Sequence, residues 1–211
     1  IKLIYSMKTP TYWTKAKRHL SERDKKLSRI MQSHKGFLTT RSNAFYSLCK
    51  SIVGQQISVQ AADSVWSKFS KKCKRVSPKR VNELKKSDLS QCGLSRQKVE
   101  YLKVLSENFL NKNFNIAKLK KLDDEDAIKY LCENKGIGVW TAEMFLMFNQ
   151  NRPNIFPEQD IGLLKAISKN YKTNYPPTKE QLKRFKKKWS PYCSVATWYL
   201  WRSIDPVVVE Y

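Results

Sequence analysis

The sequence predicts an all-α protein, and three observations support this. Apolar residues recur at helical spacing along most of the chain. No run shows the sustained two-residue alternation that is typical of a half-buried strand. The length of 211 residues suits one large domain or two small helical lobes. We therefore expect helices joined by short loops.

The first half of the chain contains four such segments. Residues 12–32 carry apolar groups at helical spacing, and Ser21 and Asp24 mark a break within that run. Residues 43–52 and 58–70 follow as two helices joined by the sequence VGQQI. A short helix is expected over 77–87, starting near Ser77 and Pro78.

The second half continues the pattern. Gly93 ends one element and Ser95 caps the next. Acidic residues open the segment 122–134, which suits a helix N-terminus, and the segment VWTAEMFLMF is apolar nearly all round, which predicts a buried helix. Three further helices are expected in IGLLKAISK, TKEQLKRFKKKW and PYCSVATWYLWRS, the last with Pro191 at a first-turn position.

The charge balance points to a polyanion. Lys and Arg number 41 against 18 Asp and Glu, which gives a formal net charge of +23. The excess is spread along the chain and includes KKCKR (71–75) and KRFKKK (183–188). A nucleic acid is the favoured partner; the alternative is a lysine-rich composition with no ligand.

The cysteines indicate reduced thiols in an intracellular protein. Their number is five, which is odd, and no two form a C-x-x-C pair, so no zinc or iron–sulfur site is expected. No apolar run reaches membrane-spanning length and IKLIY is too short for a signal peptide, so we expect no membrane partner. The expected location is cytoplasmic, nucleoid-associated as in bacteria, or otherwise intracellular. Met7 is a candidate for the natural start.

The stretch NKGIGVWTAEMF (134–145) predicts a phosphate-binding hairpin. Glycine accepts positive φ and lets a ligand approach bare backbone, and the helix that follows points unpaired N–H groups outward. The N–H groups of Gly136, Gly138, Val139 and Trp140 could hold a DNA phosphate without reading sequence. Hairpin carbonyls could also bind a monovalent cation, Na⁺ or K⁺. The alternative is an ordinary turn between helices.

Several segments together resemble a known superfamily. They occur in the family's order and at similar intervals, and they are SIVGQQISVQAA (51–62), GLSRQKVEYL (93–102), GIGVWTA (136–142), IFPEQDIGLLKAI (155–167) and WSPYCSVATWYLW (189–201). The chain thereby resembles the helix-hairpin-helix DNA glycosylases (HhH-GPD), and most closely the 3-methyladenine DNA glycosylase II family. The resemblance implies two helical lobes with an interlobe active-site cleft. Their expected ranges are 42–150 for the central lobe, 11–41 and 151–205 for the second lobe, and 1–10 and 206–211 for the tails.

The resemblance makes Asp160 the catalytic carboxylate. A structural N-cap is the alternative, and Glu158 is a nearby competitor that does not align with the family's motif. Breaking an N-glycosidic bond develops positive charge on the sugar, which an ionised carboxylate in a low-dielectric site stabilises. A base methylated at N3 or N7 is already cationic and leaves as a neutral species. The absence of a second catalytic acid therefore fits alkylated purines as substrates.

The resemblance also implies an aromatic base pocket formed by Trp140, Met144 and Trp201. An indole face attracts a cationic base. Bifunctional members of the superfamily place a Schiff-base lysine where this chain has Trp140, so strand cleavage is not expected. For both tryptophans the alternative is core packing.

Further residues are implied as DNA contacts. Lys135, at a position where the family usually has proline, is interpreted as a phosphate contact beside Gly136, Gly138, Val139 and Thr141. Two loops are candidates for filling the gap left by a flipped base, and the side chains concerned are Gln55, Gln56, Leu94 and Arg96. The alternative is that both are plain interhelical loops.

These inferences predict a monofunctional DNA glycosylase that removes alkylated bases, of the 3-methyladenine and 7-methylguanine type, from double-stranded DNA. We expect a monomer with no required cofactor. Two alternatives remain open from the sequence. One is a bifunctional glycosylase/lyase, and the other is a non-catalytic helix-hairpin-helix DNA-binding module.

Overall fold

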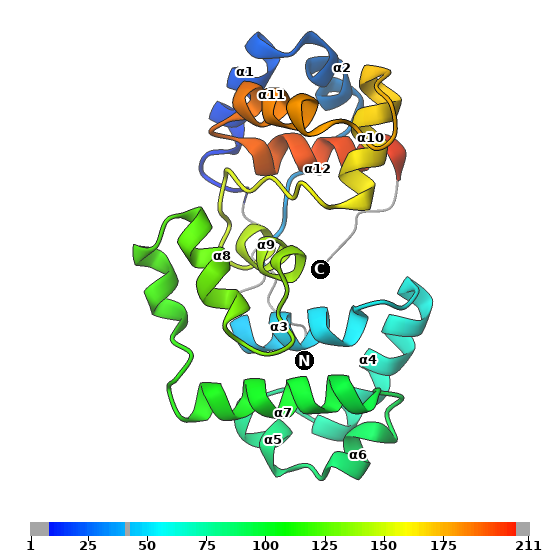
Figure 1. Ribbon diagram of the computed structural model, residues 1–211, viewed down its shortest axis with the longest axis vertical. Coiled ribbons are helices and arrows are strands. Elements are labelled where there is room, and N and C mark those ends of the chain that lie inside the picture. Colours follow the sequence, from blue (N-terminus) through cyan, green and yellow to red (C-terminus); the bar gives the residue numbers. More distant parts are fainter. Residues whose placement is uncertain (1–8, 41–42, 206–211) are drawn as a thin grey trace. The chain divides into compact units, whose positions relative to one another are not determined.

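The computed structural model describes residues 9–40 and 43–205, and all its regular elements within these ranges are helices (Figure 1). The all-α prediction is therefore confirmed. Met7 and most of the two predicted tails lie outside the described residues. Within the described ranges, no helix is long and apolar enough to cross a bilayer.

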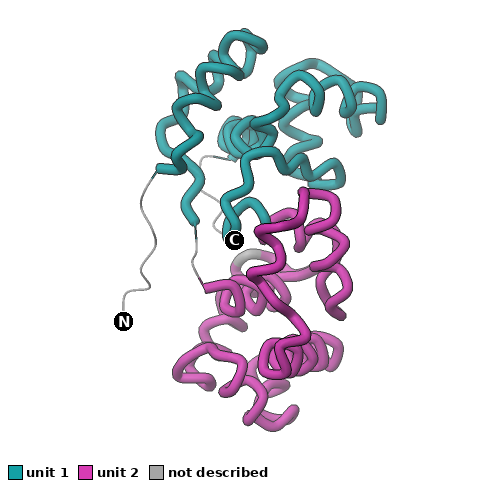
Figure 2. The backbone as a smooth tube through the Cα atoms, turned by 90° about the vertical axis from the view of Figure 1, so that its left-hand side faces the viewer, with its two compact units in different colours: residues 1–42, 146–210 teal, residues 43–145, 211 magenta. Residues whose placement is uncertain are grey.

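The chain divides into two compact units (Figure 2). Unit 1 combines two separate segments, residues 1–42 and 146–210, and unit 2 is formed by residues 43–145. The chain passes from unit 2 to unit 1 within a single helix, α9 (Val139–Phe148).

Unit 1 is organised around its last helix. α12 is buried along most of its length and packs against the other helices of the unit. The helices of unit 1 are α1 (Trp13–Arg23), α2 (Lys25–Ser33), α10 (Ile161–Tyr171), α11 (Lys179–Trp189) and α12 (Cys193–Ile204). The break predicted near Asp24 is the junction of α1 and α2, where the Asp24 side chain caps α2 by accepting from the N–H groups of Lys26 and Leu27.

Unit 2 is organised around α7, which packs against α3, α5 and α6. Its helices are α3 (Ala44–Gly54), α4 (Val59–Cys73), α5 (Pro78–Glu83), α6 (Lys86–Ser90), α7 (Arg96–Leu110), the 3-10 helix η1 (Ile116–Lys121), α8 (Asp124–Cys132) and the start of α9. Ser95 caps α7 as predicted, by accepting from the N–H of Lys98.

Two details differ from the sequence prediction. The single helix expected over 77–87 is two helices, because Leu84 and Lys85 adopt extended backbone between α5 and α6. Pro191 does not lie in the first turn of α12, since the helix begins at Cys193 with Tyr192 as its N-cap residue.

Candidate active site

Asp160 lies where the loop after α9 turns into α10. It is the N-cap residue of α10, and its Oδ1 accepts a hydrogen bond from the N–H of Leu163 at 2.6 Å. The side chain is only 7% exposed. A buried carboxylate at a helix N-terminus is favourably placed because the helix presents its positive end there.

A second donor reaches the same carboxylate oxygen. The indole N–H of Trp201, on α12, donates to Asp160 Oδ1 at 2.7 Å. The Trp201 ring lies parallel to Phe148, with centroids 6.2 Å apart. The carboxylate is thus held from two sides, by the first turn of its own helix and by a packed indole on the neighbouring helix.

Gly162 makes this approach of the indole sterically feasible. A Cβ atom at this position would lie 3.1 Å from Asp160 Oδ1 and 3.1–3.2 Å from two atoms of the Trp201 ring. Those distances are tighter than nine in ten real Cβ contacts. Gly162 was not predicted as a site residue from the sequence, although glycine is a poorer helix former than alanine and its presence in a helix often has a packing reason.

The loop that delivers Asp160 is tied to the start of α12. Ser194 Oγ accepts from the N–H of Ile155 at 2.9 Å and donates to the carbonyl of Arg152 at 2.7 Å. The N–H of Ser194 donates to the carbonyl of Pro153. The path of the chain toward Asp160 is therefore fixed by hydrogen bonds of the hydroxyl and the N–H of Ser194 with the backbone of the loop.

The competing carboxylate has a different environment. Glu158 is exposed and pairs with Lys186 at 3.4 Å, where both side chains are about half exposed. A solvated carboxylate of this kind acts in a high-dielectric medium, where its field is weak. Of the two acidic residues in this loop, only Asp160 occupies a buried site.

In unit 2, the hairpin between α8 and α9 needs one of its two glycines for conformation. Gly136 has φ of +93°, and a Cβ there would overlap the ring of Tyr101. Gly138 has no positive φ, and a Cβ there would meet nothing within 4 Å. Only Gly136 of the two therefore needs to be glycine to form the turn, whereas Gly138 leaves exposed backbone at the start of α9.

The hairpin is linked to the loop that follows α3. The side-chain amide of Gln55 donates to the carbonyl of Gly136 at 2.9 Å and to Thr141 Oγ1 at 3.3 Å. Thr141 is 3% exposed, so this hydroxyl faces the interior, whereas Lys135 and Val139 are exposed. Two carbonyls of the hairpin already accept hydrogen bonds: that of Gly136 from Gln55, and that of Asn134 from the N–H of Ile137.

The other predicted residues of unit 2 differ in accessibility. Trp140, in the first turn of α9, is half-buried, and Met144 is 1% exposed. Leu94 is 5% exposed and belongs to the core, which disfavours it as an inserting side chain, while Arg96 is exposed. Gln56 is exposed and has φ of +56°, a conformation that is uncommon outside glycine.

Comparison with protein-family models identifies the family of this chain. The sequence model of the HhH-GPD superfamily base excision DNA repair proteins matches residues 49–191. That range contains the hairpin, Asp160 and both candidate gap-filling loops.

Individual relatives agree with this match. A DNA-3-methyladenine glycosylase of Saccharomyces cerevisiae is 30% identical over 210 residues, which cover 91% of this chain and 71% of the yeast protein. The crystal structure of DNA-3-methyladenine glycosidase from Bacillus halodurans is 28% identical with a TM-score of 0.81, covering 93% of this chain and 92% of that one. The 3-methyladenine DNA glycosylase Mag1 of Schizosaccharomyces pombe, solved in complex with abasic DNA, is 25% identical with a TM-score of 0.77, covering 90% and 96%.

Proposed function

Because the chain belongs to the HhH-GPD superfamily of base excision DNA repair proteins, we propose that it is a monofunctional DNA glycosylase that releases alkylated bases from DNA. The observation that carries this proposal is the carboxylate of Asp160, which is buried and held by Leu163 and Trp201. The relatives named 3-methyladenine DNA glycosylases give the substrate class.

Asp160 supplies the charge that the reaction needs. As the bond between the sugar and the base lengthens, positive charge develops on the sugar, and a fixed carboxylate in a low-dielectric site stabilises it. The bonding electrons leave with the base; water then adds to the sugar carbon and loses a proton to the solvent. An alkylated purine that starts as a cation departs as a neutral molecule, so a second carboxylic acid is not required.

Trp140 occupies the position at which bifunctional relatives place the Schiff-base lysine, so strand cleavage by a residue at this position is excluded. A Schiff base with the sugar requires an amine nucleophile, which an indole does not provide. We assign Trp140 to contact with the flipped base, because an indole face attracts a cationic ring. Met144, one turn further along α9, is proposed to line the same pocket. Trp201 has the same proposed role in addition to its hydrogen bond to Asp160.

The hairpin in unit 2 is proposed to hold the DNA backbone. Gly138 and Val139 lie at the exposed start of α9, where N–H groups and the helix dipole favour a phosphate. Gly136 shapes the turn, Lys135 adds a positive charge, and Thr141 acts through its bond to Gln55. We propose double-stranded DNA with a damaged base as the partner of a monomeric protein.

A monovalent cation would fit beside this phosphate. The hairpin offers backbone carbonyls, which are the oxygen donors that hard cations prefer, and each carbonyl oxygen has a second lone pair beyond the one used in the hairpin. Na⁺ or K⁺ bound there would offset part of the charge of the phosphate.

Gln56 and Arg96 are the proposed gap-filling side chains. Rotating a nucleotide out of the duplex costs a few kcal/mol and leaves a hole in the base stack. Both side chains are exposed, and the positive φ of Gln56 persists only because its surroundings hold it.

Two matched amide substitutions test the proposal. Asp160→Asn should abolish release of methylated bases, measured by mass spectrometry on methylated duplex DNA, while DNA binding measured by fluorescence anisotropy is retained. Glu158→Gln, on the same loop, should release bases at the wild-type rate because Glu158 is solvated. Near-normal release by Asp160→Asn would overturn the assignment of this carboxylate.

A further inference from the structure

Lys98 caps the helix that precedes the Gln55–Gln56 loop. Its ammonium group, in the first turn of α7, donates to the carbonyls of Val53 at 2.8 Å and Gln55 at 2.7 Å. The last carbonyls of a helix have no partner within the helix and carry its negative end, so a cation there is stabilising. Lys98 is partly buried at this point, and burial lowers the pKa of its ammonium group.

Gln55 is held through both its backbone and its side chain. Its backbone carbonyl accepts from Lys98, and its side-chain amide donates to the carbonyl of Gly136 and to Thr141 in the hairpin. The next residue is Gln56, with its positive φ and exposed side chain. A continuous set of hydrogen bonds therefore runs from α7 through the loop to the hairpin, and all of it lies in unit 2.

We propose that Lys98 is a positioning residue that fixes Gln56 for insertion into the duplex and couples this loop to the phosphate-binding hairpin. The proposal rests on the proposed function, because insertion matters only if a base is flipped. With the Gln55 carbonyl fixed, the backbone of Gln56 has little freedom to leave its left-handed conformation. The energy needed to order an inserting side chain has then been spent during folding, before DNA binds.

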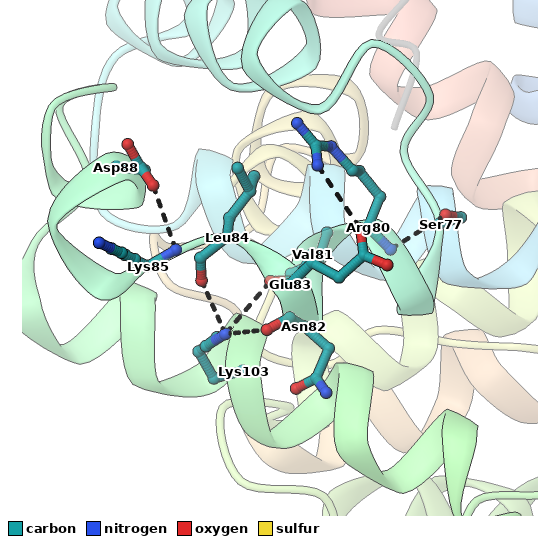
Figure 3. A network of polar contacts seen from close by, with 9 residues as sticks. All are labelled: Ser77, Arg80, Val81, Asn82, Glu83, Leu84, Lys85, Asp88 and Lys103. Carbon is teal, nitrogen blue, oxygen red and sulfur yellow. Dashed lines mark hydrogen bonds and ion pairs between the residues drawn. The ribbon is translucent and has the colours of Figure 1, made fainter.

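The same helix provides a matched comparison. Lys103 also donates to the carbonyl end of another helix, to Leu84 at 2.8 Å, Val81 at 3.4 Å and Asn82 (Figure 3). Its partner α5 leads into α6 and not into the hairpin. Lys103 is therefore a cap of the same chemistry without the link to Gln56.

The experiment compares duplex and single-stranded substrates. Single-turnover rates of 7-methylguanine release are measured on the same methylated oligonucleotide, alone and annealed to its complement. In a single strand there is no pair to break and little stack to fill, so a gap-filling side chain has little effect. Lys98→Met should lower the duplex rate at least about tenfold and the single-strand rate less than about threefold, and Lys98→Arg should restore the duplex rate.

The controls separate positioning from stability. Lys103→Met should lower the melting temperature yet keep the wild-type ratio of duplex to single-strand rates. If Lys98→Met does not fold, Gln55→Met tests the same coupling. It removes the two side-chain hydrogen bonds to Gly136 and Thr141, keeps the backbone carbonyl that accepts from Lys98, and should show the same selective loss. Equal loss on both substrates, or the same change of ratio in Lys103→Met, would overturn the role of Lys98. Release from neither substrate by the wild-type protein would instead overturn the proposed function.

Discussion

The indole N–H of Trp201 and the Oδ1 atom of Asp160 lie 2.7 Å apart, so a residue of α12 orients the carboxylate that begins α10. Leu163 donates to the same oxygen. A carboxylate held by two donors keeps one orientation, and a fixed orientation is what stabilisation of a developing charge requires. Trp201 therefore has a role in positioning that is separate from any contact with the base.

Trp201→Phe isolates that role, because it removes the N–H and keeps an aromatic ring. A hydrogen bond to a charged group contributes about 1.5–3 kcal/mol, which corresponds to roughly a 10- to 100-fold slower release of base. Single-turnover excision on methylated duplex DNA measures it. Trp198→Phe, a buried tryptophan on the same helix, is the control and should retain the rate. An unchanged rate in Trp201→Phe would show that the bond does not contribute to catalysis.

Gly162→Ala should harm activity although alanine is the better helix former. Alanine in a helix is usually favoured over glycine by about 0.5–1 kcal/mol. Here the added Cβ would press on both Asp160 and the Trp201 ring at 3.1 Å, so the carboxylate or the indole must shift. We expect slower base release with a melting temperature close to that of the wild type. Equal activity in the two proteins would mean that the site adapts without loss.

Much of the helical framework follows from local signals in the sequence. The break at Asp24 and the cap at Ser95 are both short-range hydrogen bonds, and such bonds are encoded within three or four residues. The hydrogen bond between Trp201 and Asp160 and the link from Lys98 through Gln55 to the hairpin connect residues 41 to 86 positions apart. Contacts of that separation depend on how helices pack, which the spacing of apolar residues does not specify.

The two hairpin glycines should respond differently to alanine. Gly136→Ala forces a side chain into positive φ, at about 1–2 kcal/mol, and against the Tyr101 ring, so the melting temperature should fall. Gly138→Ala meets open space and should fold normally. If a phosphate approaches the backbone there, Gly138→Ala should weaken binding to duplex DNA several-fold. Anisotropy titrations at one fixed salt concentration measure this, and unchanged affinity in Gly138→Ala would argue against a phosphate at the hairpin.

Asp24 should make the stability of unit 1 depend on pH. Burial by itself raises the pKa of Asp24, but hydrogen bonds from Trp189, the Leu27 N–H, Lys188 and Tyr171 outweigh it and hold the pKa below its ordinary value. A carboxylate with a lowered pKa in the folded state contributes stability above the ordinary value of about 4. That contribution is lost as the pH falls through the lower, folded value.

Asp24→Asn should remove this dependence. The amide keeps an acceptor for the cap of α2 but loses its charge opposite Lys188, and its N–H₂ group would face the donors of Trp189 and Tyr171. We expect a loss of about 2–3 kcal/mol, or roughly 5–10 °C in melting temperature, at pH 7. The difference from the wild type should shrink as the pH falls from about 4, the ordinary pKa, through the lower folded pKa, where the wild-type carboxylate also becomes neutral. Asp88→Asn removes an ion pair with Lys72 that is more exposed than the pair of Asp24 with Lys188. It should change the melting temperature little at pH 7 and at pH values below about 4. A difference between Asp24→Asn and the wild type that stays constant down to low pH would contradict the role of the ionised form.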